Sequence, residues 1–255
     1  MSSQIVYEHP LNERTRTLLR LEHLFAKTQH FMGGDDPWDT RGAIEALLDI
    51  VAISARADVR NELLKELDRL IATLNRVRHQ PGVHKGTLDR ILADLGDVTS
   101  RLHDRASQLG QRAREDSLLK SVAQRVAIPG GTCGFDLPLY HRWLSQPAAA
   151  RRQALADWMA DLHPASDAIE LILSLTRTSA APRPMTAPLG FFQEALDPQA
   201  PAQMVRVGLD GDGILYPEIS GHKNRFSIRF MEAPAGEKPV QCRDEVAFTL
   251  ACCVF

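Results

Sequence analysis

The sequence has few cysteines and almost no net charge, and each shortage excludes a class of protein. Among its 255 residues there are four cysteines, none of them in a CxxC pair, so neither a disulfide scaffold nor a zinc ribbon is indicated. Thirty Lys and Arg oppose 32 Asp and Glu, which gives a net charge of −2. No overall positive field is therefore available to hold a long polyanion. The 44% hydrophobic and 24% charged content is that of a folded globular protein.

Long apolar segments are also missing. No run of 18 apolar residues is present to span a bilayer, and the first 20 residues carry charges where a secretory signal needs an apolar centre. These charges are Glu8, Glu13, Arg14, Arg16 and Arg20. We therefore expect a cytoplasmic protein with no direct membrane insertion.

Local signatures of catalysis and of metal binding are weak. The chain contains no GxSxG, no GxxxxGK[ST], no GxGxxG after a strand and no HExxH. Its nine histidines are scattered, with no pair at metal-ligand spacing beside a cysteine. We expect no catalytic residue, no metal and no other cofactor.

One segment keeps an enzyme open as an alternative. The run IPGGTCGFDLP at residues 128–138 combines glycines with Cys133 and Asp136, and His141 is the nearest base in sequence. The same residues also form a turn, in which the glycines end one helix and Asp136 caps the next before Pro138. We favour the turn, because Gly and Pro form turns and end helices far more often than they position a catalytic nucleophile.

The spacing of apolar residues predicts helices from about residue 12 to residue 178. The clearest helix begins after Asp58, a suitable N-cap, and ends at Gln80-Pro81-Gly82; the next begins near Thr87. The short loop between them predicts a helical hairpin. Shorter or earlier helices are indicated at residues 11–31, 40–53, 118–127, 138–144, 148–162 and 165–176.

The C-terminal part changes to a period of two, which is typical of strands. Strands are predicted at residues 204–209, 225–231 and 246–254, and Ile5-Val6-Tyr7 offers a fourth from the N-terminus. Prolines at 182, 184 and 188 indicate a connector before them. The fold class is thus α+β, with a helical domain at 12–180 and a mostly antiparallel β-domain at 1–11 and 186–255.

The segment YPEISGHKNRFSIRFM, residues 216–231, predicts a strand with one apolar and one cationic face. Asn224, Phe226, Ile228 and Phe230 alternate with Lys223, Arg225, Ser227 and Arg229. Arg225 and Arg229 would lie about 13 Å apart on one side, a spacing that suits an extended anionic partner.

Two further interpretations of this basic strand stay open. Exposed Lys and Arg are an ordinary feature of a solvated sheet face. A module that binds nucleic acid or anionic lipid would also use them, although near-zero net charge and the lack of an aromatic platform beside Arg225 count against it.

Several long motifs together resemble the ZapD family of bacterial division-ring-associated proteins. They follow the family's order along the whole chain: residues 8–25, 59–69, 114–119, 128–138 and 219–231. The departures are an Ala- and Pro-rich connector around residues 179–202 and the last two residues, Val254-Phe255. The motifs are long enough to make this resemblance specific.

The resemblance implies a cytoplasmic homodimer that has no catalytic activity. Such a protein binds the C-terminal tail of FtsZ, the tubulin-like division GTPase, and cross-links and bundles its protofilaments at midcell. It thereby promotes Z-ring assembly and lowers the GTPase activity of FtsZ. In the family a basic pocket receives the tail, and its arginines correspond to Arg56, Arg225 and Arg229. Lys223 and His222 are further candidates for this pocket.

Overall fold

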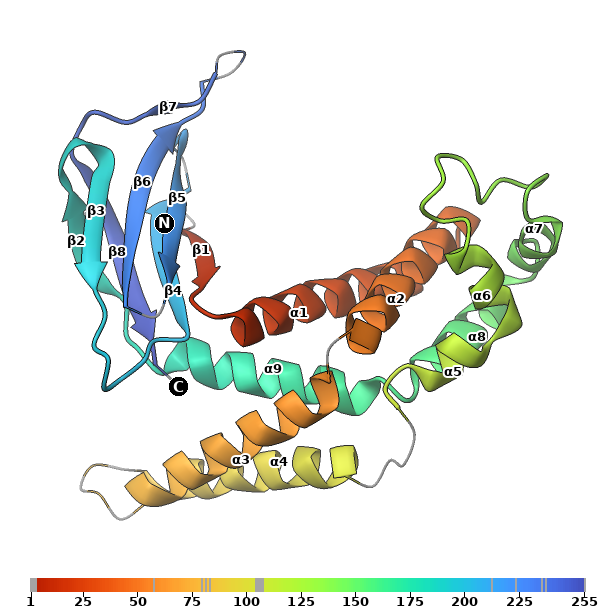
Figure 1. The fold of residues 1–255 in the computed structure, drawn as a ribbon, viewed down its shortest axis with the longest axis horizontal. Helices are drawn as coiled ribbons and strands as arrows, with labels where there is room; N and C mark the ends of the chain where they lie inside the picture. Colours follow the sequence, from red (N-terminus) through yellow and green to blue (C-terminus); the bar gives the residue numbers. More distant parts are fainter. Residues whose placement is uncertain are drawn as a thin grey trace. The chain divides into compact units, whose positions relative to one another are not determined.

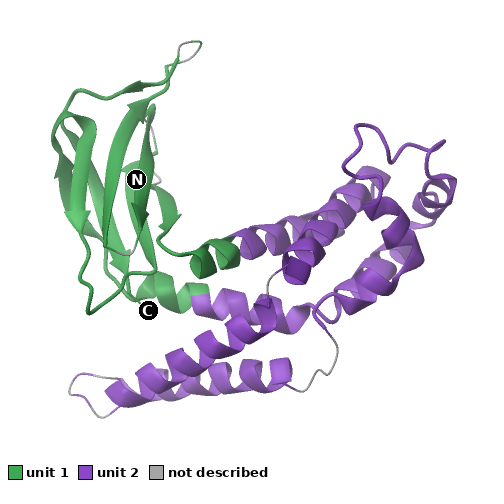
Figure 2. Ribbon diagram, viewed as in Figure 1, with its two compact units in different colours: residues 1–19, 173–255 green, residues 20–172 purple. Residues whose placement is uncertain are grey.

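The computed structural model describes two compact units. The described residues are 4–56, 58–78, 80, 82, 84–103, 108–211, 213–222, 224–234, 236 and 238–254. Unit 1 comprises residues 1–19 and 173–255, and unit 2 comprises residues 20–172 (Figure 2).

Unit 1 contains two antiparallel sheets. Its strands are β1 (Gln4–Pro10), β2 (Arg183–Ala187), β3 (Phe191–Ala195), β4 (Met204–Asp210), β5 (Leu215–His222), β6 (Arg225–Glu232), β7 (Val240–Gln241) and β8 (Val246–Cys253). One sheet has the order β1-β4-β8-β2; the other has the order β3-β6-β5, with β7 paired to β6 (Figure 1). The two sheets share one apolar core.

The core of unit 1 follows from the alternation along β6. Phe226, Ile228 and Phe230 are buried, while Arg225 and Arg229 between them are exposed. Phe230 meets Phe248 of the other sheet with ring centroids 4.9 Å apart. The prediction that one face of this strand is core and the other cationic is confirmed.

The N-terminal strand completes the first sheet, as the sequence predicted. β1 pairs antiparallel with β4 over its whole length, from Gln4 opposite Asp210 to Pro10 opposite Met204. The α+β class is therefore confirmed, with a strand from one end of the chain inserted beside strands from the other.

Two local predictions in this unit are wrong. The predicted proline-rich connector contains a strand, β2, which pairs with β8. The sheet tolerates Pro184 because β2 is an edge strand, and on its unpaired side no backbone N–H is needed for a hydrogen bond to another strand. Residues 216–231 form two strands, because the chain reverses after His222 and β5 pairs antiparallel with β6.

The described helices fall between β1 and β2. They are α1 (Glu13–Met32), α2 (Pro37–Arg56), α3 (Val59–Val77), α4 (Lys85–His103), α5 (Gln111–Glu115), α6 (Ser117–Ala123), α7 (Pro138–Leu144), α8 (Ala148–Met159) and α9 (His163–Thr178). The boundary between the units falls within α1 and α9. None of the helices in the described ranges combines the length and apolarity that crossing a membrane requires.

The helical hairpin predicted in unit 2 is confirmed. The Asp58 carboxylate accepts a hydrogen bond from the backbone N–H of Asn61 at 3.4 Å and so caps α3. Leu63, Leu67 and Leu70 on one face of α3 are buried, and α3 packs against α4. Pro81 of the predicted turn lies outside the described residues.

A carboxylate held by two guanidinium groups joins three elements of unit 1. Arg177 of α9 donates through Nε and Nη2 to the two carboxylate oxygens of Glu8, both at 2.8 Å. Arg206, directly opposite Glu8 on β4, donates through Nε at 3.0 Å. Burial alone would raise the pKa of Glu8, but the hydrogen bonds and charges of Arg177 and Arg206 outweigh it and lower the pKa below its ordinary value of 4.5.

We predict that Glu8→Gln destabilises unit 1 by about 1–2 kcal/mol at pH 7, because it replaces charge-assisted hydrogen bonds with neutral ones at a carboxylate that is partly solvated. A lowered carboxyl pKa stabilises the fold above about pH 5, and this stabilisation is lost as the pH falls through the folded-state value. Urea unfolding at several pH values should therefore show the difference between the two proteins shrinking below pH 4.5. An equal difference at pH 7 and at the lowest pH would contradict the assignment.

Candidate functional site

The exposed face of the β3-β6-β5 sheet carries the basic row that the sequence predicted. Residues opposite one another in antiparallel strands point to the same side, so the register defines this face. Arg225 of β6 lies opposite His222 of β5, and Arg229 lies opposite Glu218. Arg225, Arg229 and His222 are all exposed.

A cavity of about 270 Å³ opens at the Arg225 end of this face. It is lined by Gln193, Ser220, Gly221, His222, Arg225, Phe226 and Ser227. The polar side chains among them are a guanidinium, an imidazole, two hydroxyls and an amide, all able to donate hydrogen bonds. Among the described residues that line it, none brings a carboxylate, so the cavity suits an anionic group.

Gly221 allows β5 to approach β6 closely at this cavity. A Cβ at position 221 would lie 2.6 Å from the Cβ of Phe226, which is too close for any other residue without a shift of the strands. His9 of β1 forms a hydrogen bond with the backbone of Gly221. Burial and the charge of Arg16 lower the pKa of His9 below its ordinary value, although the bond to Gly221 acts in the opposite direction.

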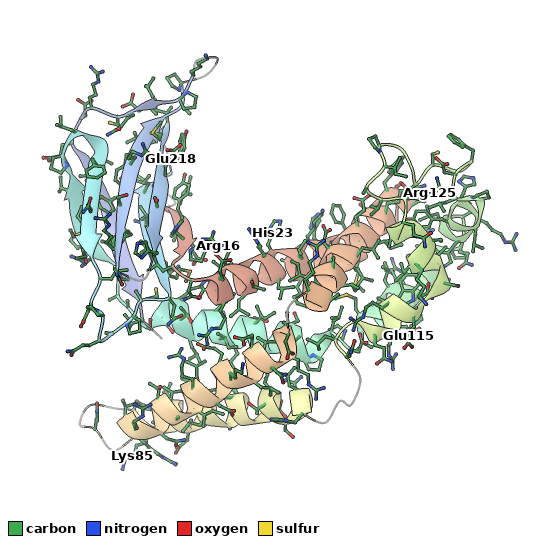
Figure 3. The ribbon with its side chains drawn as sticks, viewed as in Figure 1. Arg16, His23, Lys85, Glu115, Arg125 and Glu218 are labelled. Carbon is green, nitrogen blue, oxygen red and sulfur yellow. The ribbon has the colours of Figure 1, made fainter. Side chains whose placement is uncertain are left out.

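The second arginine of the row is partly engaged. Nη2 of Arg229 lies 3.8 Å from a carboxylate oxygen of Glu218, which Figure 3 labels on β5. Both side chains are about half exposed, so this ion pair is weak. Within the described ranges Arg225 has no such carboxylate partner, and it is the more available of the two for an incoming anion.

Arg56 lies in unit 2, at the C-terminal end of α2. It is exposed and lines a cavity of about 530 Å³ together with Arg60, Arg114 and His103. Arg60 donates to the backbone carbonyl of His103 at 3.0 Å, and Arg114 donates to that of Leu109 at 2.7 Å. The cationic character of this cavity extends beyond the one arginine that the resemblance indicated.

The structure brings some of the predicted site residues together and separates others. His222 and Arg225 share one cavity, and Arg229 lies further along the same face. Lys223 lies outside the described residues. Gln193 and Ser220 were missed, because their position beside Arg225 follows from the pairing of β3 and β5 with β6.

The loop at residues 128–138 forms a series of turns in unit 2. The thiol of Cys133 donates to a carboxylate oxygen of Asp136 at 3.4 Å, and Asp136 also pairs with Arg125 at 3.5 Å. The hydrogen-bond acceptor of the thiol is thus a carboxylate that is also paired with an arginine. The turn interpretation of the loop is confirmed, but the prediction that Asp136 caps the next helix is wrong: the N-cap position of α7 is Leu137, without a side-chain capping bond, because the Asp136 carboxylate is engaged with Cys133 and Arg125.

One group of potential metal ligands lies in unit 1. Ligand atoms of Glu232, Cys242 and Asp244 all lie within 4.8 Å of one another. Burial, together with a hydrogen bond to Glu232, raises the pKa of the Cys242 thiol. The thiol donates to the backbone carbonyl of Asp244 at 4.0 Å, and the raised pKa favours its neutral form, whereas a metal would require the thiolate.

The chain resembles known proteins over its whole length. The model of a family described as "ZapD: Cell division protein" matches residues 19–229. The cell division protein ZapD of Methylococcus capsulatus is 44% identical over 254 residues, which is 100% of both chains. Those of Dechloromonas aromatica and Escherichia coli O1:K1 are 41% and 39% identical, each over at least 98% of this chain and 99% of the relative. The chain belongs to the ZapD family of cell division proteins.

Proposed function

We propose that this protein binds the C-terminal tail of FtsZ through the basic face of the β3-β6-β5 sheet, without catalytic activity of its own. The observation that carries the proposal is the cavity at Arg225, in which every charged or polar lining side chain in the described ranges can donate to a carboxylate. Arg229 continues the positive charge along the same face. We also propose Arg56, which the resemblance indicates, as a partner-binding residue on unit 2 in its own right.

The chemistry of the face suits weak and reversible binding of an acidic peptide. A guanidinium group can bind a carboxylate through two parallel hydrogen bonds, which an ammonium group cannot reproduce. The residues are exposed and the cavity is small, so one site would have only modest affinity. Modest affinity is sufficient where many tails are crowded along a polymer, because a bivalent binder then gains from their effective concentration.

Cross-linking requires two such sites, and unit 2 offers a surface for a second copy of the chain. We define the apolar corner as Trp38, Ile128, Phe135 and Leu139, all large and exposed. Phe135 is 85% exposed, Trp38 75% and Leu139 61%. Large apolar side chains exposed on α2, on α7 and on the segment between α6 and α7 favour an interaction site, and interfaces between identical subunits are rich in such residues.

Arg41 connects the three segments that carry the apolar corner. Its guanidinium lies 5.2 Å from the ring centroid of Trp38 and 4.9 Å from that of Tyr140 in α7. It also donates to the backbone carbonyl of Thr132 at 3.0 Å, in the segment between α6 and α7 (Figure 1). The corner is therefore a fixed surface, and we propose that it pairs two protomers into a homodimer.

A homodimer with a tail-binding site on each protomer would join neighbouring FtsZ protofilaments. In this proposal it bundles them at midcell, promotes Z-ring assembly and lowers FtsZ GTP turnover. The competing candidate is a module for nucleic acid or anionic lipid, because phosphate oxygens would accept from the same donors. Co-sedimentation with polymerised FtsZ, with and without its tail, tests the proposal directly, and retention on a phosphate polymer without FtsZ would favour the competitor.

We expect Arg225→Ala to weaken binding of an FtsZ tail peptide about 10- to 100-fold, since a hydrogen bond to a charged group contributes about 1.5–3 kcal/mol. Arg225→Glu combined with Arg229→Glu should weaken it further. Affinity should also fall as salt rises to physiological strength, where the screening length is about 8 Å. Fluorescence anisotropy of a labelled tail peptide measures each effect.

Ile228→Ala is the matched control on the same strand. It should lower the free energy of unfolding by about 2–5 kcal/mol, because Ile228 is fully buried, and should leave the affinity of the folded protein unchanged. The arginine variants should show the opposite pattern. A folded protein with both arginines reversed that still binds the tail at wild-type affinity would refute the site.

Glu218 should oppose the binding of an acidic partner. Glu218→Gln removes the carboxylate 3.8 Å from Arg229 and releases that arginine for the peptide. Tail affinity should rise about two- to fivefold, the range that corresponds to a surface ion pair of up to about 1 kcal/mol. The same peptide titration measures it, and weaker binding would show that Arg229 needs Glu218 for its position.

Phe135→Asp combined with Leu139→Asp should separate dimerisation from tail binding. Charges buried in an apolar interface are strongly disfavoured, so sedimentation analysis should show a monomer that binds tail peptide normally but no longer bundles filaments. Ile214→Asp, the same change at an exposed apolar residue of unit 1, is the control and should remain dimeric. If the double variant remains a dimer, the interface lies elsewhere. If it becomes a monomer and still bundles FtsZ, bivalent cross-linking is ruled out.

A further inference from the structure

The basic face of the β3-β6-β5 sheet continues into an apolar surface at its other end. Phe191 of β3 is 42% exposed and lies opposite Arg229 of β6. Met231 follows on the same side of β6, since it is two residues beyond Arg229. Leu189, which is 70% exposed, lies two residues before Phe191, in the short 3-10 turn that leads into β3. We call Leu189, Phe191 and Met231 the apolar ledge.

The position of Leu189 is fixed by hydrogen bonds of its own turn. Its carbonyl accepts from Nε2 of Gln241, which lies opposite Met231 on β7, at 3.3 Å. The next residue, Gly190, donates its N–H to the carbonyl of Asp244 at 2.9 Å. Leu189 therefore lies beside the exposed side of the sheet.

Leu189 is held there in an unfavourable backbone conformation. It has a φ of 53°, and it is the one residue other than glycine with a positive φ in the described ranges. This left-handed region is disfavoured for a residue with a Cβ, whereas glycine adopts it readily. The exposed leucine side chain contributes little to the core in return, so its use lies at the surface.

We propose that the partner segment presents an acidic group to the Arg225 cavity and a large apolar side chain to the apolar ledge. This inference rests on the proposed function and specifies the peptide chemistry that the site selects. Phe191 is opposite Arg229, four residues along β6 from Arg225, which corresponds to about 13 Å. An extended peptide covers that distance in about four residues, so the two groups are separated by about four positions. Charge selects the peptide at one end of the face, and apolar burial selects it at the other.

The test is a double-mutant cycle that combines protein variants with peptide variants, and fluorescence anisotropy measures the affinity of each pair. The probes are the FtsZ tail peptide and a version in which every large apolar residue is replaced by serine. Wild-type protein should bind the serine version at least about tenfold more weakly, the size of effect typical of an interface anchor. A variant with Leu189→Gly and Phe191→Ala should bind the natural tail about tenfold more weakly and should distinguish the two peptides less than about threefold.

Leu189→Gly alone keeps the test valid if Phe191→Ala impairs folding. Glycine suits the φ of 53° at this position, so this variant should unfold at the same or a higher urea concentration while it binds the tail more weakly. A variant that had simply lost structure would show both a lower urea midpoint of unfolding and a lower affinity for the tail. The two readouts therefore distinguish a binding role of the side chain from a structural one.

The outcomes separate this inference from the proposed function. If the ledge variants bind the tail at wild-type affinity while Arg225→Glu with Arg229→Glu abolishes binding, the ledge inference is overturned and the tail site stands. If wild-type protein does not distinguish the two peptides, the ledge inference is likewise overturned. If wild-type protein binds no tail peptide at all, both are overturned.

Discussion

The structure of unit 1 depends on the carboxylate of Glu8 between two guanidinium groups. Glu8 precedes the long helical segment in the sequence, whereas Arg177 and Arg206 both follow most or all of it, yet both arginines donate to this one side chain of β1. This contact attaches the N-terminal strand to β4 and to the last helix. His9, the next residue of β1, reaches the backbone of Gly221 beside the Arg225 cavity. The candidate site thus depends indirectly on the placement of the first strand.

The alternation along β6 separates stability from recognition. Phe226, Ile228 and Phe230 fill the space between the two sheets, whereas Arg225 and Arg229 contribute almost nothing to that core. Changes on the exposed side can therefore alter partner choice at little cost in folding free energy. A sheet face of this kind can combine donors at one end with apolar side chains at the other, as the cavity and the apolar ledge do.

Each unit carries surface features that only the proposed function connects. In unit 2 the cavity at Arg56 is cationic, and the apolar corner is fixed by Arg41. In unit 1 the basic face and the apolar ledge share one sheet. Membership of a cell division family is compatible with the binding roles proposed for these surfaces.

Patterns within short segments were determined by the sequence alone. The alternation at residues 225–231, the α3-α4 hairpin after the Asp58 cap and the β-branched N-terminal strand all follow from the spacing of neighbouring residues, and each is confirmed. Pairings between distant segments were decided by the tertiary structure. No local pattern could show that Pro184 lies on an edge strand, that Gln193 faces the Arg225 cavity, or that Glu8 binds Arg177, because each depends on which strands and helices become neighbours after folding.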